Sequence, residues 1–325
     1  MSINSIEIKY YMKNKLFIYA FALVQLVVIG SANAQTGEKI IITGSRFTYP
    51  LVNKWIEEYK KTNPDVPFHI IPRGTPNVDS ANVIINAHEL TPEEIRPGYT
   101  VINFGRYAIF PVANEKNPLV KTYLKEGIDK QELSKLFFKK YDPLATPEKE
   151  SKKEKSKYKP SLYTREQKAC APTTFARNYG FVQQDILGKP IGGDDHHLIA
   201  AIKKDTSGIT YNNLGFIYDI KTRKLQNGLQ IIPLDINSNN KLDEKENFYA
   251  SLDDVISKLE SNSYPEITVG YVNISFPAQA NENNKNITAF LNWVLNEGQK
   301  YNHEYGFLSV QEEVLAKQKQ IVSSK

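Results

Sequence analysis

Short β-branched segments alternate with amphipathic segments in the first third of the chain. Residues 39–43 read Lys-Ile-Ile-Ile-Thr, which is typical of a buried strand, and residues 50–61 predict a helix. That helix would place its large apolar residues on one face: Leu51, Trp55, Ile56 and Tyr59. Phe68–Ile71 and Val83–Ile85 predict two more strands, and Thr91–Glu94 predicts a helix start. Strands that alternate with helices usually pair in parallel, so the sequence predicts an α/β protein.

Two β-rich segments, Thr100–Val112 and Ile267–Phe276, stand where the chain could pass between two lobes. We assign residues 35–107 and 268–325 to lobe I, to which the helical C-terminus returns, and residues 108–267 to lobe II. The elements predicted in lobe II are helices at Lys130–Phe138 and Thr173–Gln184, a strand at Gly208–Tyr211 and a hairpin-like segment at Phe216–Ile232.

The N-terminus has the layout of a cleavable secretory signal. Lys13 and Lys15 precede an apolar run at 16–29, and small residues lead to Ala34. The apolar run is shorter than the roughly 20 residues that a spanning helix needs, which disfavours the alternative of a permanent anchor. We expect residues 1–34 to be a signal peptide cleaved near Ala34, and the mature protein to be periplasmic.

The composition narrows the possible partners. Removing residues 1–34 takes away three lysines and one glutamate, which lowers the formal net charge from +5 to +3. Much of the excess lies in residues 148–159, where interleaved glutamates favour a solvated loop over a nucleic-acid patch. Cys170 is the only cysteine, so no internal disulfide can form. We expect Cys170 to pack without reacting, because the surrounding sequence supplies no catalytic base.

Three blocks of the chain carry a combined pattern. The first is Ile42–Trp55, which begins with a strand and a Gly-Ser turn, and the second is Gly105–Pro118 followed by Leu133–Phe138. The third is Phe290–Gln299 with Tyr305–Leu308. In their order and spacing these blocks resemble the phosphate-binding components of bacterial ABC importers. The resemblance implies a two-lobed type II periplasmic binding protein fold, with mixed sheets and a ligand cleft between the lobes. It also implies a monomer that is no enzyme and that delivers phosphate or a related oxyanion to an inner-membrane ABC permease.

The first binding segment that the resemblance implies is the turn after the first strand. A helix N-terminus offers unpaired N–H groups to an anion. Ser45 and Thr48 could add hydroxyl donors, Phe47 its backbone N–H, and Arg46 a guanidinium group that suits phosphate. The family commonly carries threonine where Arg46 stands. The alternative is an ordinary turn in which Ser45 caps the helix and Arg46 faces solvent.

The second binding segment is expected near residues 163–177. Arg165 matches the arginine of the family, but Ala169-Cys170-Ala171 replaces its Ser-Gly-Thr. Pro172 suits the first helical position, and Thr173 and Thr174 could supply the missing hydroxyls. The aspartate that the family uses to accept a proton from phosphate has no clear match. Asn86 and His88 lie near its expected place.

A separate motif resembles an EF-hand calcium loop. Residues 235–246 place oxygen ligands at loop positions 1, 3, 5, 7, 9 and 12. These are Asp235, Asn237, Asn239, the carbonyl of Lys241, Asp243 and Glu246. We expect a structural Ca²⁺ here that pins the preceding strand and a following helix at 248–259. The alternative is a polar turn that needs no metal.

Other polar clusters are weaker. Residues 194–197 read Asp-Asp-His-His after two glycines, which we interpret as a solvated turn. The chain contains no Gly-x-Ser-x-Gly, His-Glu-x-x-His or Walker motif. The sequence thus favours a solute-binding protein. The alternative is a calcium-stabilised surface or scaffold protein of the same fold that has lost or changed its ligand.

Overall fold

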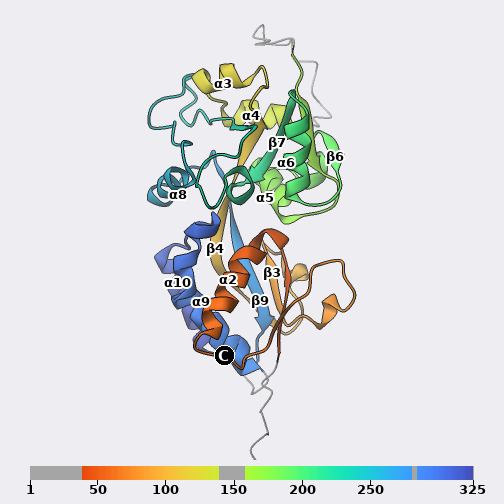
Figure 1. Cartoon of the computed structure of the whole chain (residues 1–325), viewed down its shortest axis with the longest axis vertical. Coiled ribbons are helices and arrows are strands. Elements are labelled where there is room, and N and C mark those ends of the chain that lie inside the picture. Colours follow the sequence, from red (N-terminus) through yellow and green to blue (C-terminus); the bar gives the residue numbers. More distant parts are fainter. Residues whose placement is uncertain (1–38, 139–157, 280–283, 325) are drawn as a thin grey trace, which may run out of the picture.

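The structure is a computed structural model that describes residues 39–138, 158–279 and 284–324. The predicted signal peptide and residues 148–157 of the lysine-rich segment lie outside this range. Figure 1 shows two halves stacked along the long axis of the molecule. The lower half, here lobe I, contains β1 (Ile40–Gly44), α2 (Tyr49–Lys60), β2 (Phe68–Ile70), β3 (Val83–Asn86), α9 (Lys285–Asn296) and α10 (Glu312–Ser323).

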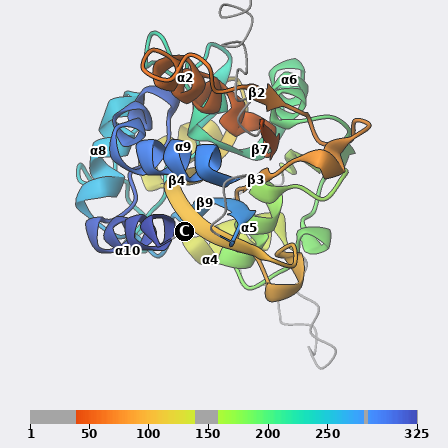
Figure 2. The same cartoon turned by 90° about the horizontal axis from the view of Figure 1, so that it is seen from below.

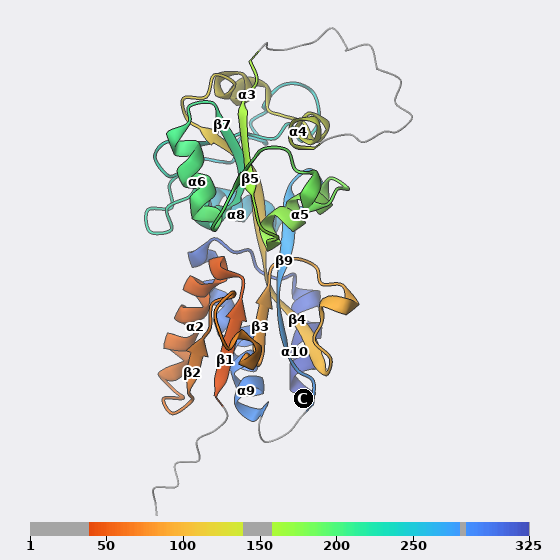
Figure 3. The same cartoon turned by 90° about the vertical axis from the view of Figure 1, so that its right-hand side faces the viewer.

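The upper half, here lobe II, is formed by the middle of the chain. Its helices are α3 (Val120–Glu126), α4 (Lys130–Phe137), α5 (Cys170–Asn178), α6 (Asp195–Lys204), α7 (Leu214–Ile217) and α8 (Leu252–Ser261). Its strands are β5 (Ser161–Arg165), β6 (Lys189–Ile191), β7 (Gly208–Asn213) and β8 (Leu229–Ile231). Figure 3 shows α5 at the edge of lobe II that faces lobe I.

Two long antiparallel strands, β4 (Tyr99–Asn114) and β9 (Thr268–Pro277), run through both lobes (Figure 3). They coincide with the two segments predicted to pass between lobes. The sheet has the order β2-β1-β3-β9-β4-β7-β5-β6, and β8 pairs with β4. The lobe boundaries predicted from the sequence stay a prediction, because the sheet and the hydrophobic core continue through the junction.

Parallel pairing is confined to the strands that alternate with helices. β1 pairs in parallel with β2 and β3, and β5 pairs in parallel with β6 and β7. The long strands join these groups through antiparallel contacts, β3 with β9 and β4 with β7. The result is the mixed α/β architecture that the resemblance implied.

Helix α2 forms for the reasons that the sequence suggested. Pro50 occupies the second helical position, where a missing N–H costs nothing. The apolar face is buried, and the indole N–H of Trp55 donates to the carbonyl of Gly298 at 2.9 Å. Seen from below in Figure 2, α9 lies between α2 and α10, and it contacts both helices. This packing fixes the turn that precedes α2.

Three predicted helices differ from those observed. Helix α5 begins at Cys170, so Pro172 is its third residue, and it ends at Asn178. Helix α8 begins at Leu252, because Ser251 caps it by accepting a hydrogen bond from the N–H of Asp254 at 3.1 Å. The segment at Thr91 forms only one 3₁₀ turn, Pro92–Glu94. Within the described residues, no helix combines the length and the apolarity that crossing a membrane requires.

Candidate functional site

A cavity of about 730 Å³ lies between residues of the two lobes. Lobe I contributes the turn Gly44–Phe47, Arg73 and the segment Tyr305–Phe307. Lobe II contributes Arg165 at the end of β5 and the residues at the starts of helices α5, α6 and α7. Several helix N-termini therefore meet at one cavity, and their first N–H groups have no intrahelical acceptor.

The turn after β1 depends on a glycine. Gly44 has a φ of +139°, and a Cβ placed on it would lie 2.0 Å from the carbonyl oxygen of Ile85 on the adjacent strand β3. No other residue fits such an approach. The N–H of Ser45 donates to the same carbonyl at 2.9 Å, which directs the following residues toward the cavity.

Four of the predicted ligand-binding residues line this cavity: Ser45, Arg46, Phe47 and Arg165. Arg46 is exposed, and its guanidinium donates to the carbonyl of Arg73 at 3.2 Å. Phe47 packs its ring against Tyr107 and Phe307, with centroid distances of 5.1 and 5.8 Å. Its side chain therefore forms an apolar wall.

The predicted threonines lie elsewhere. Thr48 is fully buried, and its hydroxyl donates to the carbonyl of Ser45 at 2.7 Å. Thr173 donates to the carbonyl of Ala169 at 2.8 Å, and Thr174 donates to that of Ala87 at 3.2 Å. None of the three lines the cavity. A hydroxyl has a single proton, so these three donors are already in use.

Arg165 forms an ion pair within the cavity wall. Its Nη1 lies 3.0 Å from Oδ1 of Asp195, and both side chains are about nine-tenths buried. A second N–H group, on Nη2, donates to the carbonyl of Gly193. The Nε atom is buried and has no hydrogen-bond partner among the described residues. Burial raises the pKa of Asp195, although the charge of Arg165 opposes that shift.

Residues 194–197 do not form the solvated turn that we predicted. They begin helix α6, with Asp194 as its N-cap accepting from the N–H of His196 at 3.2 Å. Asp195 faces inward and lines the cavity, because Arg165 compensates its burial. Asp194 also lines the cavity, and the two are its only acidic residues in the described chain.

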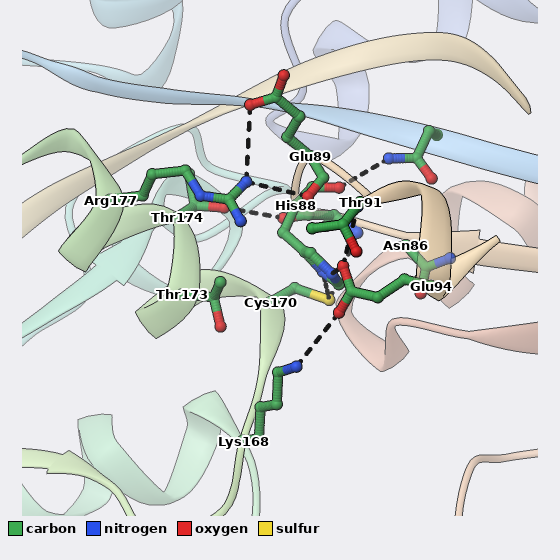
Figure 4. Close-up of polar contacts among 12 residues, drawn as sticks. Asn86, His88, Glu89, Thr91, Glu94, Lys168, Cys170, Thr173, Thr174 and Arg177 are labelled. Atoms are coloured by element: carbon green, nitrogen blue, oxygen red, sulfur yellow. Dashed lines mark hydrogen bonds and ion pairs between the residues drawn. The ribbon is translucent and has the colours of Figure 1, made fainter. Parts of the chain in front are cut away.

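A second polar cluster surrounds Cys170, the first residue of α5 (Figure 4). Its Sγ lies 3.2 Å from Nδ1 of His88 and 3.1 Å from the hydroxyl oxygen of Ser45. The N–H of Ala87 also points to Sγ, at 3.4 Å. All three partners belong to lobe I, so the sulfur of lobe II forms a polar contact between the lobes. Cys170 is partly buried and lines the cavity.

The cluster extends from His88 to two further charges. Nε2 of His88 lies 3.3 Å from Oε2 of Glu94, and the ammonium of Lys168 lies 3.2 Å from Oε1 of Glu94 (Figure 4). The N–H of Thr91 donates to Glu94 at 3.2 Å. Burial raises the pKa of Glu94, but these hydrogen bonds and the charge of His88 outweigh burial and lower the pKa to about 2.

Cys170 and His88 shift each other's pKa. The hydrogen bond to Cys170 raises the pKa of His88, and Glu94 adds to that effect. Burial raises the pKa of the Cys170 thiol, but His88, Ser45 and the N–H of Ala87 together lower it below its usual value. Both pKa shifts act in the direction of a thiolate beside an imidazolium. The sequence around Cys170 supplies no base, but the fold brings His88 to the sulfur from 82 residues away.

The EF-hand-like loop is held by its own hydrogen bonds. Asp235 accepts from the N–H groups of Asn239 and Asn240 at 3.1 and 2.7 Å. Glu246 accepts from the N–H groups of Ile236 and Asn237 at 2.8 and 3.1 Å. Within the described residues, no three His, Cys, Asp or Glu side chains gather closely enough to hold a metal ion. Calcium at this loop stays a prediction.

Sequence reasoning missed His88 as the partner of Cys170, Glu94 as the partner of His88, and Asp195 as the partner of Arg165. A usable signal existed for Glu94. It stands three residues after Thr91, as in a capping box, which predicts a carboxylate held close to the turn. No local sequence pattern indicates the pairing of Cys170 with His88 or that of Arg165 with Asp195.

Comparison with known proteins places the fold. No protein-family model matches the chain, and no curated protein is similar to it in sequence. Among solved structures, an ABC-type phosphate transport receptor from Vibrio cholerae is similar, with a TM-score of 0.55 and 15% identity over 83% of this chain and 100% of that one. A putative phosphate ABC transporter substrate-binding protein with bound phosphate, from Clostridium perfringens, has a TM-score of 0.54 and 14% identity over 84% and 100%.

A possible phosphate binding protein from Planctomyces limnophilus also matches, with a TM-score of 0.51 and 13% identity over 89% of this chain and 98% of that one. At these identities the likeness establishes the fold alone. It confirms the predicted two-lobed type II periplasmic binding protein fold.

Proposed function

We propose that this chain, which shares its fold with phosphate receptors, is an exported solute-binding protein that captures phosphate or a related oxyanion for an ABC permease. The observation that carries the proposal is the charge of the interlobe cavity. Four cationic side chains line it, Arg46, Arg73, Arg165 and Lys168, against the two carboxylates of α6. A cavity with this excess, at converging helix N-termini, suits an anionic ligand.

Arg165 supports an anion more specifically. A buried N–H group without a partner costs free energy, and native proteins rarely leave one without a reason. The Nε of Arg165 is such a group, and the residue lines the cavity. An oxyanion oxygen would satisfy this donor, while Asp195 continues to orient the guanidinium.

The pairing of Asp195 with Arg165 bears on ligand choice. A free carboxylate that faces a ligand favours a protonated oxyanion, which can donate to it, whereas a carboxylate engaged by an arginine makes no such demand. Phosphate carries protons near neutral pH and sulfate does not. We therefore include sulfate and molybdate with phosphate as candidate ligands.

Isothermal titration with each of the three anions tests the proposal. We expect one of them to bind, and Arg46→Ala to weaken it by about tenfold or more, since a hydrogen bond to a charged group contributes about 1.5–3 kcal/mol. Arg177→Ala is the matched control, because Arg177 is a cation outside the cavity that pairs with Glu89 at 3.6 Å. It should bind as the wild type does.

The absence of heat with all three anions at millimolar concentration would refute an oxyanion ligand. The alternative function, a scaffold protein that has lost its ligand, would then be favoured. An Arg46→Ala, Arg165→Ala double variant that keeps full function in the cell would also favour that alternative.

A further inference from the structure

The Cys170 cluster lies on the wall of the same cavity, and its central pair, Cys170 and His88, has no role in the oxyanion proposal. The chain contains one cysteine, and its sulfur receives contacts from an imidazole, a hydroxyl and a backbone N–H group. Each of these can donate a hydrogen bond to an anionic sulfur. Three donors that converge on one sulfur are an arrangement that stabilises a thiolate, the reactive form of cysteine.

The groups that face the sulfur come from several elements. His88 follows β3, and Ser45 lies in the turn between β1 and α2. Tyr107 on β4 is the other titratable group near the sulfur, and its burial raises its pKa well above the usual value, so it stays a neutral phenol. Glu94 lies behind His88 on the far ring nitrogen. His88 is the ionisable group that contacts the sulfur directly.

Access is provided by the cavity. Cys170 lies on its wall, and the volume of about 730 Å³ leaves room for a small organic molecule. The first residue of a nine-residue helix is also where the helix dipole favours a negative sulfur. The contacts to the sulfur, its place at the helix start and its access to the cavity thus all favour a reactive cysteine.

We propose that Cys170 is a nucleophilic thiol, with His88 as its base, that forms mixed disulfides with small disulfides entering the cavity. In the reaction the Cys170 thiolate attacks one sulfur of the disulfide. A new S–S bond forms to Cys170 while the original S–S bond breaks, and the departing thiolate takes the proton of the His88 imidazolium. The disulfide is the only co-reactant, and the electrons balance because one S–S bond replaces another.

The modification would also change the contact between the lobes. A disulfide sulfur carries no negative charge, so it accepts hydrogen bonds from Ser45 and His88 only weakly. The adduct occupies the cavity beside the turn Gly44–Phe47. The thiol state of Cys170 therefore controls a polar contact between lobe I and lobe II, whatever ligand the cavity takes.

The test measures the rate at which the folded protein reacts with 5,5′-dithiobis(2-nitrobenzoic acid) between about pH 5.5 and pH 9. We expect the wild-type rate to change less than about threefold between pH 6 and pH 8, because the proposed Cys170–His88 pair keeps the sulfur as a thiolate over this range. His88→Asn keeps a side-chain amide near the position of Nδ1 but carries no charge. We expect it to react about tenfold or more slowly at pH 6, and to approach the wild-type rate near pH 9.

His69→Asn is the matched control, since His69 lies exposed on β2 away from the cluster. It should react as the wild type does. Glu94→Gln tests the positioning role of Glu94, and we expect its pH profile to move toward that of an ordinary thiol. Cystamine should add one half-molecule to the wild type, measured as intact mass, and none to Cys170→Ser.

Two readouts keep the proposal open to refutation if His88→Asn folds poorly. The ultraviolet absorbance of the thiolate, measured in the wild type against Cys170→Ser, should persist down to about pH 6. A wild-type rate that rises about tenfold per pH unit between pH 6 and pH 8 would overturn the proposal. So would a folded protein that forms no adduct although the urea-unfolded chain does.

Discussion

Nη1 of Arg165 lies 3.0 Å from Oδ1 of Asp195, although 30 residues separate them in the chain. Arg165 ends strand β5 and Asp195 begins helix α6, so the pair joins two elements at the cavity. Both side chains are about nine-tenths buried, which makes each charge dependent on the other. The site thus combines a buried ion pair with a donor, Nε, that has no partner within the described residues.

Removing one member of this pair should be costly. We expect Arg165→Ala to lower the free energy of unfolding by about 3–5 kcal/mol, because Asp195 would stay buried without its partner. The Arg165→Ala, Asp195→Ala double variant should recover part of that loss. Urea unfolding of the purified proteins measures both. The control is Arg177→Ala, which breaks an exposed pair with Glu89 and should lower the free energy of unfolding by less than about 1 kcal/mol. If Arg165→Ala and Arg177→Ala lowered it equally, the buried pair would have no special role.

Acid should remove the contribution of the Glu94 carboxylate to the stability of the fold. Its pKa is about 2 in the folded chain against 4.5 for a free glutamate, so its contribution to stability is complete above about pH 4.5. That contribution is lost as the pH falls from about 4.5 toward 2, because the folded state must then give up the ionised carboxylate. The melting temperature of Glu94→Gln should therefore fall less steeply than that of the wild type in this range. Glu89→Gln, whose side chain is 85% exposed, is the control and should follow the wild type.

The turn after β1 should not tolerate a side chain at Gly44. A Cβ there would lie 2.0 Å from the carbonyl oxygen of Ile85, so β1 and β3 would have to separate. We expect Gly44→Ala to lower the free energy of unfolding by about 3 kcal/mol or more. Gly74→Ala is the control, since Gly74 has a φ of +83° but open space around its Cβ position. It should cost only about 1–2 kcal/mol, the price of the left-handed backbone. Equal losses at both sites would refute a steric cause at Gly44.

Calcium binding at residues 235–246 remains to be measured. With a dissociation constant of about 10⁻⁴–10⁻³ M, 10 mM Ca²⁺ would stabilise the fold by about 1–3 kcal/mol. We therefore expect the melting temperature to rise with Ca²⁺ and to fall with EDTA. Asp235→Ala should abolish the difference between the two conditions. Lys241→Ala should preserve it, because only the backbone carbonyl of Lys241 is a predicted ligand. An unchanged wild-type melting temperature on adding EDTA would exclude the site.

Much of the fold could be predicted from short patterns. The alternation of strands and helices in residues 39–85 predicted the parallel group of β1, β2 and β3, and two β-rich segments predicted β4 and β9. These predictions succeed because the hydrophobic periodicity of a strand or a helix can be recognised within a few residues. The helix boundaries were less accurate. Whether α5 begins at Cys170 or Thr173 depends on what its first turn packs against.

For the candidate site, too, some residues could be identified from the sequence and others only from the structure. The family resemblance pointed to the turn at 44–47 and to Arg165, and both line the cavity. The partners of Arg165 and Cys170 were not identified from the sequence. Asp195 was expected in a solvated turn, and the base for Cys170 lies 82 residues before it in the chain.

By itself the sequence determined the α/β class, the two strands that run through both lobes, and one wall of the cavity. Only the tertiary structure decided the chemistry at that wall. It brought His88 against Cys170 and Asp195 against Arg165, and it turned the hydroxyls of Thr48, Thr173 and Thr174 toward backbone carbonyls. The physical reason is that helix and strand periods are local, whereas a pKa or an ion pair depends on which distant groups share a desolvated space.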